Sequence, residues 1–188
     1  RLLSSAASDV YKRQAMTGPD GKLSTPLARE DLAAIDGIVM LAAGTSHYAA
    51  MVARYWIESL ARVPVSCEIA SEYRYRKPVT GAFSCAVAIS QSGESLDTLM
   101  AMRHAGEAGL RTISLVNVPG STIAREADMV MPTRAGPEIG VASTKAFTAQ
   151  LTALISFAVA LAEAKGQISV ERRDEIHAAI QGLPSMVG

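Results

Sequence analysis

A short turn of small polar residues offers the clearest chemistry in the sequence. Residues 90–95 read Ser-Gln-Ser-Gly-Glu-Ser and supply three hydroxyls, an amide side chain and a glycine. Apolar residues 86–89 precede them as a predicted strand, and a helical pattern follows. The first-turn N–H groups of a helix have no intrahelical partner, and the helix dipole adds partial positive charge there. We therefore predict that this turn cradles a phosphate group.

Two further turns of similar composition also precede helical patterns. Residues 44–47 read Gly-Thr-Ser-His, and residues 138–145 read Glu-Ile-Gly-Val-Ala-Ser-Thr-Lys. A hydroxyl in a single turn of this kind is most simply an N-cap. Capping needs only one hydroxyl per helix, so three such turns at one edge of a sheet indicate a binding site. The ligand that suits it is small, phosphorylated and rich in hydroxyls, as a sugar phosphate is.

Other classes of site fit the sequence poorly. There is no P-loop lysine in the turn and no G-x-G-x-x-G after the first predicted strand, so a dinucleotide is not expected. The chain has 18 basic and 18 acidic residues, a balance that suggests neither a nucleic-acid nor a membrane surface. Cys67 and Cys85 form no metal-ligand spacing and no disulfide framework. We expect no metal, no cofactor and two buried thiols in a reducing cytoplasm.

The elements that must position these turns alternate along the chain. Five apolar runs are predicted strands: residues 38–43, 65–70, 85–89, 112–116 and 129–132. Helical patterns follow at residues 46–61, 96–108, 122–127, 143–164 and 170–181, the last with Ser169 as its N-cap. The apolar stretch 146–162 contains Gln150 and is shorter than the ~20 residues that span a bilayer, so we expect a core helix. The order predicts an α/β fold, a three-layer α/β/α sandwich on a five-stranded parallel sheet of flavodoxin or Rossmann type.

Four segments carry a more specific resemblance. They read LAAGTSHYAAMVARYWIESLARVPVSCEIASEYRYR, ISQSGESLDTL, LVNVPGSTIAREAD and EIGVASTKAFTAQL. Together they resemble the first sugar-isomerase (SIS) domain of the glutamine–fructose-6-phosphate aminotransferases (isomerizing), the glucosamine-6-phosphate synthases. ISQSGES alone is typical of any SIS domain, whereas SEYRYR and EIGVASTKAFTAQL are specific to the synthases.

The resemblance implies a substrate and a set of contacts. The family makes glucosamine 6-phosphate from fructose 6-phosphate and glutamine, without a cofactor in this domain. Its substrate contacts map onto Thr45, Ser46, Ser90, Gln91, Ser92, Ser95, Val141 and Ser143. The family usually has threonine where Ser95 stands and often cysteine where Ala43 stands. The first change keeps the hydroxyl, and the second is expected to affect packing only.

The resemblance also divides the chain and limits what it should do. We interpret residues 1–13 as a non-native tag, 14–34 as a linker, 35–166 as the SIS domain, and 167–188 as a C-terminal helix that breaks near Pro184. That helix would lead to a second SIS domain, which supplies the isomerising residues of the family, as an N-terminal domain supplies the glutaminase. We therefore expect no catalytic residue here and no turnover by the fragment alone. A homodimer in the cytoplasm is also expected, with Trp56 and the long apolar helix as surfaces to bury.

Four polar residues near the site are considered for a role in it, and two of them keep two interpretations. Glu94 fits the first turn of a helix, where a carboxylate favours the dipole, and should point away from a phosphate. His47 is a helix-start residue or a substrate contact, and Lys145 binds a phosphate or a structural carboxylate. Glu138 is a further candidate base that we do not assign. Two alternative functions also stay open: a stand-alone SIS regulator that senses a phosphosugar, and another phosphosugar isomerase or deaminase-like enzyme.

Overall fold

Five parallel strands form the centre of the molecule. The computed structural model describes residues 25–136 and 145–187, with side chains to residue 182. The strands are β1 (Ile38–Ala42), β2 (Val65–Ile69), β3 (Cys85–Ser90), β4 (Arg111–Val116) and β5 (Met129–Pro132). They pair in the order β2-β1-β3-β4-β5, and every pairing is parallel. The predicted five-stranded parallel sheet is confirmed, with each strand within one residue of its expected ends.

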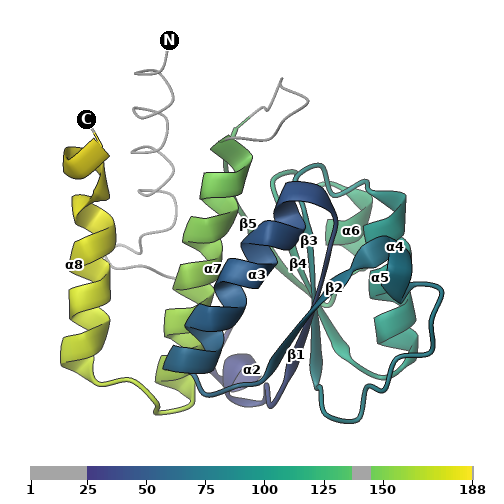
Figure 1. Cartoon of the computed structure of the whole chain (residues 1–188), viewed down its shortest axis with the longest axis horizontal. Coiled ribbons are helices and arrows are strands. Elements are labelled where there is room, and N and C mark those ends of the chain that lie inside the picture. The colour runs from purple at the N-terminus through teal and green to yellow at the C-terminus, as the bar shows by residue number, and fades with distance from the viewer. Residues whose placement is uncertain (1–24, 137–144, 188) are drawn as a thin grey trace.

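Helices cover both faces of this sheet (Figure 1). The described helices are α2 (Arg29–Ala33), α3 (Gly44–Leu60), α4 (Ala70–Tyr73), α5 (Leu96–Glu107), α6 (Thr122–Glu126), α7 (Lys145–Ala164) and α8 (Val170–Val187). α3 and α7 lie on one face, and α4, α5 and α6 lie on the other. The predicted three-layer sandwich is therefore confirmed.

Alternation along the strands divides the core in two. Successive side chains of a strand point to opposite faces, so Ile38 and Met40 of β1 pack on the α3 and α7 side. Val39 and Leu41 pack instead with residues of α4 and α5. All five residues of β1 are buried, as expected for a central strand with helices on both sides.

The long apolar helix α7 belongs to this core. Among the described residues it is the one helix long and apolar enough to cross a membrane by length and composition. It is 20 residues long, but Leu154, Phe157 and Leu161 are fully buried in the cluster it shares with α3 and the sheet. Its hydrophobicity is therefore explained by packing within the domain.

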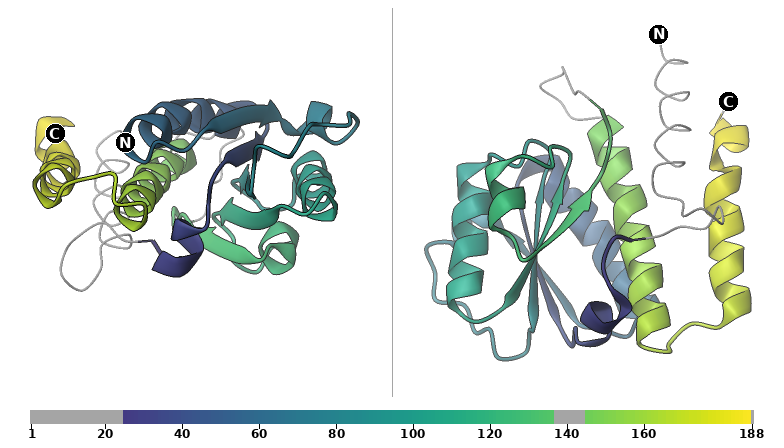
Figure 2. Two further views of the ribbon diagram at one scale, coloured as in Figure 1. Left: turned by 90° about the horizontal axis from the view of Figure 1, so that it is seen from below. Right: turned by 180° about the vertical axis from the view of Figure 1, so that it is seen from behind.

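The C-terminal helix corrects one expectation and confirms another. Ser169 caps α8 as predicted, because its Oγ accepts a hydrogen bond from the Arg172 N–H at 3.2 Å. The helix does not break near Pro184 but runs to Val187. A proline removes one backbone donor and crowds the carbonyl four residues earlier, yet the chain after it can stay helical. α8 stands beyond α7 and away from the sheet (Figures 1 and 2).

Trp56, which the sequence suggests as part of a dimer surface, already packs partly within the domain. Its side chain is half-buried and packs against the core on the α3 side of the sheet. α7, the other expected surface, is also occupied by packing inside the domain. The large exposed apolar side chains of α3 are instead those of Tyr48, Met51, Val52 and Tyr55.

Candidate functional site

The sheet order brings two of the three predicted turns together. β1 and β3 are neighbours, and Ala42 at the end of β1 pairs with Ile89 near the end of β3. From β1 the chain moves outward to β2, then crosses back to β3 on the other side of β1. In open α/β sheets ligands bind at such a switch point, beyond the carboxyl ends of the strands. The 44–47 turn and the 90–95 turn both lie at this point.

The 90–95 turn is held in shape by its own hydroxyls. Ser90 Oγ accepts a hydrogen bond from the Gly93 N–H at 3.1 Å, and Ser92 Oγ accepts one from the Glu94 N–H at 3.2 Å. Ser90 is buried, whereas Ser92 is exposed at the edge of the sheet. A hydroxyl that accepts in this way still has its own proton to donate. The turn therefore presents the hydroxyl of Ser92 as a donor to solvent or to a ligand.

Gly93 is required where the turn meets the loop before α6. Its φ is +67°, in the left-handed region that side chains disfavour. A Cβ at this position would lie 2.0 Å from Ser121 Oγ. The Gly93 backbone therefore lies closer to Ser121 than a residue with a side chain could. The Gly93 carbonyl accepts a hydrogen bond from the Ile123 N–H at 3.0 Å. The start of α6 thus holds the backbone of the 90–95 turn through this hydrogen bond.

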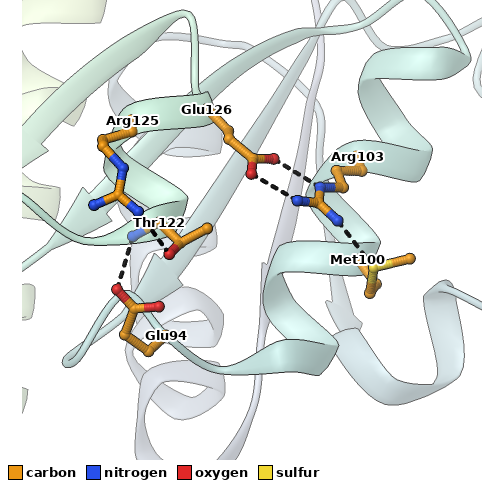
Figure 3. A network of polar contacts seen from close by, with 6 residues as sticks. All are labelled: Glu94, Met100, Arg103, Thr122, Arg125 and Glu126. Carbon is orange, nitrogen blue, oxygen red and sulfur yellow. Dashed lines mark hydrogen bonds and ion pairs between the residues drawn. The ribbon is translucent and has the colours of Figure 1, made fainter.

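Glu94 strengthens the same contact from its side chain (Figure 3). Its Oε1 accepts the Thr122 N–H at 2.8 Å, and this bond holds the pKa of the carboxyl below its ordinary value. Glu94 precedes α5, which begins at Leu96, so it caps α6 and not the first turn of its own helix as predicted. In Figure 3 its carboxylate points toward α6, which accounts for this acid as a structural residue.

An ion pair joins the helices behind this contact. Arg103 of α5 and Glu126 of α6 form two hydrogen bonds, Nε to Oε2 at 2.7 Å and Nη2 to Oε1 at 2.6 Å. Arg125 of α6 donates to Thr122 Oγ1 at 3.0 Å and to the Gly120 carbonyl. Figure 3 shows these contacts as two groups, one joining Glu94, Thr122 and Arg125 and the other joining Glu126 of α6 to Arg103 of α5.

Asn117 is an organising residue that the sequence argument did not identify. It follows β4, and its N–H donates to the Gln91 carbonyl at 3.1 Å. Its side-chain Oδ1 accepts the Ala135 N–H at 2.6 Å, and its Nδ2 donates to the Gly136 carbonyl at 2.8 Å. One residue therefore joins the 90–95 turn to the chain leaving β5. Its place at the carboxyl end of a strand is the signal that could have found it.

Helices α3 and α5 both begin without a side-chain cap. Ser95 stands at the N-cap position of α5, but its hydroxyl accepts from Thr98 Oγ1 at 3.2 Å and bonds no backbone N–H. α3 likewise has no side-chain cap, because Ala43 precedes it. Capping therefore does not explain the hydroxyls here. The first-turn N–H groups of two neighbouring helices face the same edge, where the helix dipoles favour an anion.

The 44–47 segment is built differently, because it is the first turn of α3, which begins at Gly44 and not at Ser46 as predicted. Thr45 is exposed, and Ser46 is 7% exposed. Ser46 Oγ accepts a hydrogen bond from Gln150 Nε2 of α7 at 2.9 Å, across 104 residues of sequence. His47 is half-buried, and its Nδ1 has no hydrogen-bond partner among the described residues. Gln150 was not predicted, although an amide inside an apolar helical run is the signal for such a residue.

Six of the eight predicted contacts lie on these two turns: Thr45, Ser46, Ser90, Gln91, Ser92 and Ser95. The other two, Val141 and Ser143, lie outside the described residues, as does Glu138. Lys145 is the first residue of α7.

The described residues contain no candidate metal centre and no activated thiol. Within them, no group of three or more His, Cys, Asp or Glu side chains could hold a metal ion. Cys85 is buried and Cys67 is half-buried, and both are free thiols, in partial agreement with the prediction. Burial raises the pKa of Cys85 to about 12 and that of Cys67 to about 11. Neither is a thiolate nucleophile at neutral pH.

Comparison with known proteins identifies the family to which this fold and sequence belong. Residues 31–160 match the SIS domain. The chain belongs to the SIS domain family. It is 53% identical over 157 residues to the glutamine–fructose-6-phosphate aminotransferase (isomerizing) of Zymomonas mobilis, and 52% identical over 161 residues to that of Haemophilus influenzae. These alignments cover 84% and 85% of this chain but only 26% of either relative. The SIS chain thus spans about a quarter of these relatives.

Solved structures support the same assignment. The C-terminal domain of glucosamine-fructose-6-phosphate aminotransferase from Francisella tularensis superposes with a TM-score of 0.92 at 38% identity, over 98% of this chain and 52% of that one. A putative phosphosugar isomerase from Clostridium difficile superposes with a TM-score of 0.79 at 19% identity, which shows the shared fold alone. The predicted fold class and the resemblance to the aminotransferase SIS domain are confirmed.

Proposed function

We propose that this SIS domain binds the phosphate group of a sugar phosphate in the 90–95 turn. The observation that carries the proposal is the pair of uncapped helix starts, α3 and α5, at the β1/β3 switch point. Their N–H groups and the exposed hydroxyl of Ser92 are donors at the same edge of the sheet, after two neighbouring strands. The 90–95 turn contains no lysine or arginine, so backbone N–H groups and helix dipoles would balance the phosphate charge.

The sugar is proposed to be fructose 6-phosphate or glucosamine 6-phosphate. The support is the identity of about 50% to the aminotransferases, whose name includes fructose 6-phosphate. Ser90, Gln91, Ser92 and Ser95 would hold the phosphate end. Thr45 and Ser46, with Val141 and Ser143 from the segment outside the described residues, would hold the rest of the sugar.

The chain is proposed to be the first SIS domain of an aminotransferase of this family, acting in the cytoplasm as a homodimer. We assign no catalytic residue to it. The Glu94 carboxylate accepts the Thr122 N–H of α6 and is therefore a structural group. Purified alone, these 188 residues should make no glucosamine 6-phosphate, and measured turnover would contradict this assignment.

The alternative functions remain distinguishable. A phosphosugar-sensing regulator or another phosphosugar isomerase would use the same turn, so binding alone does not separate them from the aminotransferase. The level of identity to the aminotransferases favours the first proposal. The coding sequence on either side of this segment decides, because an adjoining DNA-binding helix-turn-helix would exclude the aminotransferase.

The test of phosphate binding uses Ser92→Ala. Its side chain is exposed, so the variant should fold normally and should weaken fructose 6-phosphate binding at least tenfold by calorimetry. Adding Ser90→Ala should abolish binding, but at a cost in stability, because the buried Ser90 hydroxyl accepts the Gly93 N–H. Ser66→Ala on β2, whose hydroxyl bonds Glu68, is a matched control that should bind normally. Unchanged affinity in Ser92→Ala would place the phosphate elsewhere.

A further inference from the structure

We propose that Gln150 is a positioning residue that fixes the Ser46 hydroxyl as a hydrogen-bond donor to the bound sugar phosphate. The proposal rests on the proposed function, because it concerns the same site. It extends that site to α7, which contacts Ser46 through Gln150.

Gln150 contacts Ser46 from inside the domain, because it is the more deeply buried of the two residues. Gln150 is 1% exposed, and its Nε2 donates to Ser46 Oγ at 2.9 Å. Ser46 lies in the first turn of α3, beside the N–H groups that have no side-chain cap. Gln150 is too deeply buried to touch a ligand, so any effect it has on binding must pass through Ser46.

The polarity of this bond determines what Ser46 can do. A serine hydroxyl has one proton and two lone pairs. With Gln150 donating to one lone pair, the Ser46 proton remains available for a different acceptor. A polarised hydroxyl is also a better donor, since hydrogen bonds in a chain strengthen one another. The acceptor that fits is an oxygen of the ligand, from the sugar or its phosphate.

Stability does not explain an amide at this position. Gln150 Oε1 is buried, and among the described residues it has no hydrogen-bond partner. A buried carbonyl oxygen without a donor opposes folding. Neighbouring positions of α7, such as Ala149 and Ala153, are apolar and buried. An apolar residue of similar shape should therefore be tolerated better at position 150 than glutamine is.

This conflict between stability and binding defines the test. Gln150→Met keeps the length of the side chain and removes both polar atoms. We expect its melting temperature to equal or exceed that of the unaltered chain, while the Kd for fructose 6-phosphate rises about five- to tenfold in calorimetry. Gln150→Leu is a second variant with the same expectation. Ser156→Ala is the matched control, because its buried hydroxyl bonds Thr152 O within α7, and its Kd should not change.

A double-mutant cycle separates positioning from packing. In a Ser46→Ala background, Gln150→Met should change the Kd less than twofold, since the hydroxyl it positions is already absent. Additive losses, or an unchanged Kd for Gln150→Met alone, would overturn the proposal. Failure of the unaltered chain to bind, or normal binding by Ser92→Ala, would instead overturn the proposed function.

Discussion

The two turns at the switch point have similar sequences but different support. The 90–95 turn is tied to α6 through Gly93 and Glu94, and to the chain after β5 through Asn117. In the 44–47 segment Thr45 is exposed, and the Ser46 hydroxyl accepts a hydrogen bond from Gln150 Nε2 of α7. A fixed cradle suits a phosphate, whose shape is constant. A less constrained turn suits the sugar, whose hydroxyls and ring can take several arrangements.

The largest expected difference between the turns comes from their glycines. Gly93→Ala places a Cβ at φ +67° and 2.0 Å from Ser121 Oγ. The left-handed conformation costs about 1–2 kcal/mol, and the overpacking adds about 1–3 kcal/mol. Urea unfolding should show this loss, and fructose 6-phosphate binding should disappear with it.

Gly44→Ala is the matched control for that variant. Gly44 has φ +56°, but a Cβ there would meet nothing within 4 Å. Only the conformational cost of about 1–2 kcal/mol should therefore appear. Adding Ser121→Gly to Gly93→Ala should recover the steric part of the loss. Equal destabilisation by the two single alanine variants would contradict the contrast between a supported and an open turn.

Asn117→Ala tests the tie between the 90–95 turn and the chain leaving β5. It removes the acceptor of the Ala135 N–H and the donor to the Gly136 carbonyl. We expect a loss of about 1–2 kcal/mol in the free energy of unfolding. Asn117→Asp keeps the acceptor and loses the donor. Its free energy of unfolding should therefore lie between those of the unaltered chain and Asn117→Ala. Full stability in Asn117→Ala would show that the loop needs no such anchor.

Glu94→Gln tests the cap on α6 through its dependence on pH. The pKa of Glu94 in the folded chain is lowered from its ordinary 4.5 by the Thr122 N–H. Its contribution is therefore complete above pH 4.5 and is lost as the pH falls through the folded pKa. The difference in unfolding free energy between the unaltered chain and Glu94→Gln should shrink toward zero on acidification. A difference that grows would contradict the sign of this shift.

Arg103→Gln should have the smallest effect of the four. Arg103 and Glu126 are both largely exposed, and solvent screens such pairs strongly. We expect no change in sugar-phosphate affinity and a stability change near the error of urea unfolding. A marked loss of binding would mean that the Arg103–Glu126 pair of Figure 3 is needed to hold the 90–95 turn in its binding conformation.

The strands were predictable because they depend on local patterns. The apolar runs predicted each strand to within a residue, and the rule that parallel strands end at one edge placed Ser46 and Ser92 at the same edge of the sheet. The strand order that makes β1 and β3 neighbours came from the structure. The long-range hydrogen bonds of the site were not predictable from local patterns. Glu94 bonds a residue 28 positions away, and Gln150 one 104 positions away, so only the packed structure brings them together. The helix continues past Pro184, where a proline in the sequence predicts a break, because the ring removes a single N–H donor and the residues after it can remain helical.

One measurement tests the central claim most directly: an amide NMR titration of the 188-residue chain with fructose 6-phosphate, compared with fructose. The account predicts that fructose 6-phosphate shifts the amides of residues 92–98 most strongly, with smaller shifts at residues 44–46. Fructose at the same concentration should leave residues 92–98 nearly unmoved, because it carries no phosphate. Equal shifts with both sugars, or shifts confined to another edge of the sheet, would contradict the phosphate cradle.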